Sequence, residues 1–158
     1  MATRATTNIV KRNYKAMYRD PETVAVPADA AAWTTMLATF TDFGYFRKSS
    51  LESAVSKGDI EELDDGSELT LGYNLDLKFD VLQTGASEIT ELDGVDGEAQ
   101  DVMLVDLTAQ RAVVYKNVIV NIGETLGGTG ADAFNVEITK KNASSKAAIR
   151  IMFDIPQA

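Results

Sequence analysis

Two neighbouring pairs of carboxylates have the residue types and spacing that acid–base chemistry requires. Glu61-Glu62 and Asp64-Asp65 stand on either side of Leu63. A close pair of carboxyl groups can act as general acid and general base when burial separates their pKa values. The second pair leads into Gly66-Ser67, a turn sequence, and carboxylates beside an exposed turn behave as ordinary surface charges. We therefore expect a charged turn here and no catalytic site.

Three further motifs invite a ligand but lack part of what the ligand needs. The glycine-rich segment 123–130 is not closed by Gly-Lys-Ser/Thr and precedes no helical pattern, so we expect a flexible loop and no phosphate site. Asn142-Ala143-Ser144 matches a glycosylation triplet, which we interpret as a turn. The third motif has oxygen ligands suited to calcium, but without the helix-loop-helix spacing, so a solvated turn is favoured; its acids are Asp93, Asp96, Glu98 and Asp101.

Two residue types are missing from the chain, and their absence argues against most hydrolase and metalloenzyme mechanisms. It contains no cysteine and no histidine, which excludes disulfides, thiolate zinc sites, cysteine nucleophiles and any mechanism that uses an imidazole. Carboxylate and lysine chemistry would still need a cleft. We predict that the protein is not an enzyme, with no catalytic residues, no cofactor and no metal.

Length and hydropathy predict one domain without a membrane span. The 158 residues suffice for a single core, and the apolar stretches fall short of the ~20 residues that cross a bilayer. The N-terminal segment lacks the apolar centre of a secretion signal, so we expect synthesis in the cytoplasm.

Charge is distributed unevenly along the chain. Residues 52–106 contain sixteen acids and only two bases, whereas residues 1–19 contain no acid and five bases, Arg4, Lys11, Arg12, Lys15 and Arg19. We predict a basic N-terminal arm over residues 1–20 and one acidic domain over residues 21–158. The arm is either a solvated tail or a contact with the acidic face of a neighbouring subunit, which would build rings or filaments head to tail.

One β-strand with two distinct faces is predicted over residues 67–82. Every odd position from Leu69 to Val81 is apolar, and the intervening positions are glycine or polar. The stretch of about 16 residues would span on the order of 50 Å, which suits a large curved sheet or a barrel wall. The turn at Asp64 to Ser67 joins it to a preceding strand over residues 57–63, giving a long β-hairpin.

The remaining elements complete a mainly β fold, a sandwich or barrel with one or two short helices. We expect an extended connector at residues 19–27, where two prolines oppose a helix. A helix capped by Asp29 is predicted at residues 30–40, and a loop anchored by Trp33 is the alternative because threonine disfavours a helix. A second short helix is predicted at residues 87–92, followed by a loop at 93–97. Further strands are predicted at residues 102–108, 112–122, 133–141 and 147–155.

The order of these elements resembles the tail tube proteins of long-tailed bacteriophages, which are related to the tubes of contractile injection machines. The resemblance covers residues 20–155. It rests on Val26-Pro27-Ala28-Asp29, on Phe40-Thr41-Asp42-Phe43-Gly44-Tyr45, on the turn at Asp65-Gly66-Ser67 and on the long strand with the short helix after it. Phe43 stands where the family more often has leucine.

The resemblance implies a β-sandwich subunit that forms homohexameric rings, with long hairpins joined into an inner barrel and rings stacked into a tube. Other tail proteins, namely the terminator, tape measure and baseplate or hub, would be partners, and DNA would pass without specific binding. The location would be the virion tail. A water-filled barrel requires a polar inner wall, and the candidates to face it are Thr70, Asn74, Asp76, Lys78 and Asp80.

Contacts between subunits and rings are expected from the basic arm, from residues 41–57 and from the loop at 123–130. Two other classes of protein stay open at this point. A capsid-decorating or head–tail structural protein would share the β content but would not polymerise into tubes. A barrel that binds a small ligand, or an enzyme, would be a discrete monomer or dimer with a ligand-sized cavity.

Overall fold

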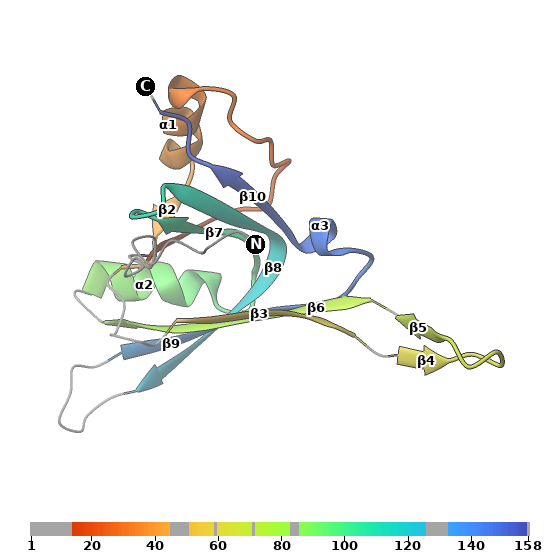
Figure 1. Cartoon of the computed structure of the whole chain (residues 1–158). Coiled ribbons are helices and arrows are strands. Elements are labelled where there is room, and N and C mark those ends of the chain that lie inside the picture. Colours follow the sequence, from red (N-terminus) through yellow and green to blue (C-terminus); the bar gives the residue numbers. More distant parts are fainter. Residues whose placement is uncertain are drawn as a thin grey trace.

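The fold is described from a computed structural model, over residues 14–44, 51–58, 60–70, 72–82, 86–125 and 133–157. Figure 1 shows strands that dominate the molecule, with short helices at its periphery. The elements are β1 (Tyr14–Arg19), α1 (Ala30–Ala38), β2 (Thr41–Asp42), β3 (Glu52–Lys57), β4 (Ile60–Glu62), β5 (Glu68–Thr70), β6 (Tyr73–Leu82), α2 (Ala86–Val95), β7 (Ala99–Asp106), β8 (Arg111–Thr125), β9 (Ala133–Ala143), α3 (Lys146–Ile149) and β10 (Arg150–Asp154).

One antiparallel sheet forms two layers because its longest strand crosses between them. The strand order is β2-β1-β7-β8-β9-β6-β3, and β10 also pairs with β8. The first part of β8, from Arg111 to Tyr115, pairs with β10, whereas Ile119 to Thr125 pair with β9. Figure 1 shows β8 curving out of the plane of β9, β6 and β3. The predicted mainly β fold is confirmed, and both of its layers belong to a single bent sheet.

We call β2, β1, β7, β10 and the first part of β8 the helix-covered layer, and the second part of β8 with β9, β6 and β3 the hairpin layer. The central strand β7 is buried on both faces. Val102 and Leu104 belong to the core between the layers, and Met103 and Val105 belong to the core under α1. A strand covered on both faces has a continuous apolar sequence, as the Val-Met-Leu-Val run of β7 has.

The helix α1 begins where its sequence predicts. Asp29 has an extended backbone, and its side chain accepts a hydrogen bond from the N–H of Ala32 at 2.8 Å, which satisfies a donor that the first turn leaves open. Trp33 and Phe40 pack into the core beneath. The helix predicted for residues 30–40 is confirmed and ends two residues earlier, at Ala38.

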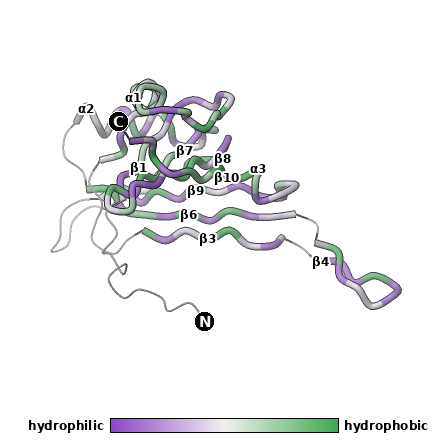
Figure 2. Tube along the Cα trace, turned by 45° about the horizontal axis from the view of Figure 1, so that its top comes forward, coloured by the Kyte–Doolittle hydropathy of each residue, from purple (hydrophilic) through white to green (hydrophobic). Residues whose placement is uncertain are grey.

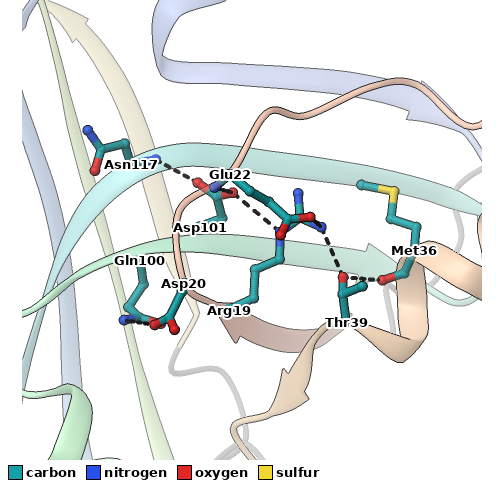
Figure 3. Close-up of polar contacts among 8 residues, drawn as sticks. All are labelled: Arg19, Asp20, Glu22, Met36, Thr39, Gln100, Asp101 and Asn117. Carbon is teal, nitrogen blue, oxygen red and sulfur yellow. Dashed lines mark hydrogen bonds and ion pairs between the residues drawn. The ribbon is translucent and has the colours of Figure 1, made fainter.

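A buried ion pair holds the segment where β8 changes layer. The β7–β8 register shifts between Gln100 and Val102, and Asn117 opposite adopts a positive φ of 47°. Asp101, only 1% exposed, accepts hydrogen bonds from the backbone N–H of Asn117 at 2.9 Å and from the Arg19 guanidinium at 3.3 Å. The bulge in β8 is thus fixed by a carboxylate of the neighbouring strand (Figure 3).

Arg19 in turn joins this pair to the end of α1. Its guanidinium donates to the Thr39 hydroxyl at 2.9 Å, pairs with Glu22 at 2.8 Å and lies 4.4 Å from the centre of the Phe40 ring. Among the described residues, every buried polar side-chain atom has a hydrogen-bond partner. The charges at this point of the core are therefore fully compensated.

Several predicted boundaries need correction. The helix expected at residues 87–92 extends over Ala86–Val95, so the predicted loop at 93–97 is wrong for its first three residues. The last strand is shorter than predicted, because Ser145 caps the short helix α3 and β10 begins only at Arg150. Within the described part of the chain, the helices are too short and too polar to span a membrane.

We predict that Asp101→Ala strongly destabilises the fold, because it removes the buried carboxylate that pairs with Arg19 and that accepts the backbone N–H groups of Asn117 and of Glu22 at 3.2 Å. The expected loss is about 3 to 5 kcal/mol of unfolding free energy, measured by urea denaturation. Asp154→Ala is the control, because it removes the exposed ion pair with Arg111 and should cost less than about 0.5 kcal/mol. Equal losses in the two variants would contradict this role for Asp101.

Candidate functional site

The β-hairpin that contains the predicted long strand keeps one register over its whole length. Glu52 pairs with Lys78 and Lys57 with Tyr73, and the same register continues from Ile60↔Thr70 to Glu62↔Glu68. Between these segments, the N–H of Gly58 donates to the carbonyl of Gly72 at 2.7 Å. The strands β3, β4, β5 and β6 therefore form a single hairpin, and its tip projects beyond the rest of the molecule (Figure 1).

The single strand predicted for residues 67–82 is wrong, because it is divided into β5 and β6. Gly72 has a φ of +152°, and a Cβ built on it would lie 3.0 Å from the Cα of Asn142. This close approach occurs at the end of β9, where β6 loses its second neighbour. Glycine is required at such a contact, and beyond it the ribbon continues with two strands only.

The tip carries the carboxylate pairs expected at a turn. Residues 61–69 are all exposed, and Leu63 and Gly66 close the turn with backbone hydrogen bonds of 2.8 and 2.9 Å. Hydrogen bonds from the hydroxyl and the N–H of Ser67 hold the pKa of the Asp65 carboxyl below its ordinary value. The acids of the tip are exposed, as the sequence predicts.

The two faces predicted for the long strand are confirmed along β6. Leu75, Leu77, Phe79 and Val81 are at most 2% exposed. On the other face, Asp76 and Lys78 are exposed, and Asn74 and Asp80 are half-buried. Hydrophilic and hydrophobic residues alternate along β6 and β9 (Figure 2). Of the predicted wall residues, Thr70 lies instead in β5, and its side chain is outside the described residues.

The polar side of β6 belongs to a wider surface that spans the hairpin layer. One row of paired residues crosses four strands, from Asn121 through Glu137 and Lys78 to Glu52. We call this surface the polar face; its members are Glu52, Asn74, Asp76, Lys78, Asp80, Asn121, Asn135, Glu137 and Thr139. It carries four acids and a single lysine, whose Nζ lies 3.4 Å from the Glu52 carboxylate.

The polar face is hollowed over β8, β9 and β6. The hollow has a volume of about 580 Å³ and is lined by residues that include Lys78, Asp80, Asp96, Asn121 and Glu137. Within the described ranges, no group of three or more acids is placed to hold a metal ion. The geometry therefore gives a broad, acidic surface of exposed and half-buried side chains.

The β9 residues of the polar face are not among the predicted site residues, although their alternating pattern is present in the sequence. Phe134, Val136 and Ile138 alternate with Asn135 and Glu137, which is the same period-two pattern as in β6. The β8 residue Asn121 gives no such signal alone. Its place follows from its pairing with Glu137.

The four acids considered for calcium do not lie together, and the solvated turn expected for them is wrong for Asp93 and Asp101. Asp93 lies in α2, Asp101 is buried beside Arg19, and the Asp96 carboxylate accepts a hydrogen bond from the N–H of Ile122. The predicted glycine-rich loop also begins later than expected, because Gly123 to Thr125 belong to β8. Residues 126–130 lie outside the described residues.

The basic arm predicted for residues 1–20 is wrong from Tyr14 onward, because β1 is an internal strand between β2 and β7. Arg19 is 8% exposed and is engaged with Asp101 in its own chain, so the contact with another subunit predicted for it is wrong. Lys15 pairs with Asp42 at 3.0 Å and is 42% exposed. Arg4, Lys11 and Arg12 lie outside the described residues.

A comparison with models of known protein families finds no match, and a comparison with curated proteins finds no similar sequence.

We predict that Gly72→Ala destabilises the protein by about 2 kcal/mol or more, because a methyl group would meet the backbone of β9 and strain a positive φ. Thermal unfolding measures the loss. The matched substitution Gly94→Ala lies in a helix with open space around it and should be stabilising by up to about 1 kcal/mol. A tolerated Gly72→Ala would show that the hairpin does not need this close contact.

Proposed function

We propose that this chain is a structural virion protein of a bacteriophage tail, a subunit of hexameric rings that stack head to tail into a hollow tube for DNA. The observation that carries the proposal is the long hairpin in one register, buried on one side of its inner half and polar on the other. A tube wall needs this division between a face that packs on its own subunit and a face in contact with water.

The strand directions of the hairpin layer support closure into a ring. Its four strands alternate in direction, since β8–β9, β9–β6 and β6–β3 are all antiparallel pairs. With an even number of strands, rotation about a ring axis places β3 of one subunit antiparallel to β8 of the next. Within the described residues, β3 has β6 as its strand partner, and it presents a short edge of mostly small side chains. The interval 41–57 predicted as a contact region includes this strand.

The charge of the polar face fits a conduit that does not retain DNA. Asp76, Asp80 and Glu137 lie on it with a single cation, Lys78. DNA binds to basic surfaces because counterions are released from its phosphates, and an acidic wall gives no such gain. Asn74, Asp76, Lys78 and Asp80 would face the bore.

The hairpin tip and the basic residues near the N-terminus are the proposed contacts between rings, with Arg4, Lys11, Arg12 and the β1 residue Lys15 as the cationic side. The terminator, tape measure and baseplate or hub proteins would be neighbours at the tube ends. Synthesis would occur in the host cytoplasm, and the mature location would be the virion tail. No catalytic step is involved.

The test is negative-stain electron microscopy of the purified protein at rising concentration, with a mass measurement in the same buffer. Hexameric rings or hollow tubes are expected. Trimers or a stable dimer would favour a capsid-decorating protein. A monomer whose melting temperature rises with a small ligand would favour a ligand-binding barrel, and either result would overturn the proposal.

We predict that Asp76→Lys combined with Asp80→Lys leaves ring assembly intact but makes the bore bind DNA. Tubes assembled with a short duplex should retain it in a salt-sensitive manner, protected from added nuclease. The control is Glu91→Lys with Asp93→Lys on α2, which reverses the same charge away from the polar face. Retained DNA that stays nuclease-sensitive in the first variant would place the polar face on the outside.

A further inference from the structure

The edge of β8 that a ring neighbour would use is partly occupied by the chain itself. Beyond Ile119, no described strand pairs with this edge. The turn after α2 lies against it instead, with Gly97 donating to the carbonyl of Val120 at 2.7 Å and Val120 donating to Glu98 at 3.1 Å. Asp96, which precedes Gly97 in the turn, accepts a hydrogen bond through its Oδ1 from the N–H of Ile122 at 2.8 Å.

The backbone groups that β8 presents at this edge follow from these contacts. The N–H and C=O of one residue point to the same side of a strand, and alternate residues repeat that direction. Because Val120 bonds to the turn, Ile122 and Glu124 present their groups to the same edge. The side chains of Val120 and Ile122 face the core, opposite Ile138 and Val136 of β9.

The edge of β3 that no described strand pairs with has the same arrangement. Gly58 bonds to Gly72 across the hairpin, so the backbone groups of Ser53, Val55 and Lys57 point away from β6. Ser53 and Val55 pair with the buried leucines of β6, and the Ser53 hydroxyl lies 2.8 Å from the hydroxyl of the buried Tyr115.

The two edges therefore match in direction and in face. Antiparallel residues that exchange hydrogen bonds lie opposite each other with side chains on one side of the sheet. On both edges, the residues with outward backbone groups carry side chains on the core side of the sheet, and Val120, Ile122 and Val55 pack there. A second copy that adds its β3 to β8 would continue the apolar side and the polar face without inverting either. The partner that fits this edge is another copy of the same chain.

We propose that Asp96 is a latch on this edge: its carboxylate holds the Ile122 N–H that the β3 strand of a second copy requires, and it delays pairing until assembly displaces it. The inference rests on the proposed tube function. Edge strands left open pair indiscriminately, and charged groups at the edge are a known means of preventing this. Asp96 is exposed and lies in the turn, so it can leave without disturbing the core.

The experiment compares wild type, Asp96→Ala, Asp96→Asn and the control Asp93→Ala, which removes the same charge from α2 three residues earlier. Light scattering gives the concentration at which tubes begin to form, and electron microscopy identifies them. We expect Asp96→Ala to lower this concentration by roughly fivefold to tenfold. In wild type, the hydrogen bond from the Ile122 N–H to the Asp96 carboxylate must be broken before β3 of a second copy can pair there. Asp96→Asn keeps an uncharged acceptor and should show a smaller decrease, and Asp93→Ala should match wild type.

Hydrogen exchange of the Ile122 amide provides a second measurement that depends on the latch. In unassembled protein below that concentration, Asp96→Ala should exchange this amide faster than wild type and Asp93→Ala; in tubes, all variants should protect it equally. Tubes that form at one concentration for all variants would overturn the latch and leave the tube function standing. Unchanged Ile122 exchange in Asp96→Ala would overturn it as well. If no variant forms rings or tubes, the proposed function and the latch fail together.

Discussion

The fold depends on the ion pair between Arg19 and Asp101. β8 must belong to both layers, and a strand can change layer only through an irregularity in its ladder. Asp101 provides the acceptor that the irregularity needs, because it binds the N–H of Asn117 at the bulge. Arg19 compensates the buried charge and connects it to Thr39 at the end of α1. One carboxylate therefore connects the structures on the two faces of β7, the core between the layers and the core under α1.

Much of the layer structure could be read from the sequence, because it follows from hydrophobic periodicity. The alternation along β6 fixed its two faces, and the turn residues Asp65 and Gly66 located the hairpin. The break at Gly72 could not be predicted, since it results from contact with Asn142, a residue 70 positions away. Strand periodicity carries no information about such an approach.

The position of β1 was misjudged for a related physical reason. Lys15 and Arg19 are basic and lie in a basic segment, which favours a solvated tail. The intervening Ala16 and Tyr18 are buried against the core, and Arg19 is buried because Asp101 pairs with it. A buried charge can be recognised in a sequence only together with its partner, and here 82 residues separate the two. The polar face was similarly predicted only for its β6 residues, since the pairing of β8 with β9 is a tertiary feature.

The unbroken register of the hairpin also determines the order in which the chain can gain structure. Its pairs close outward from Gly66 in small steps, and contacts between residues near in sequence form at low entropic cost. β1 can dock only when β7 has been made and folded, because Arg19 meets Asp101 across 82 residues. The hairpin thus acquires its edges before the core behind it is sealed. During that interval the partly folded chain has strand edges without partners, and such edges can pair with those of another copy of the same chain.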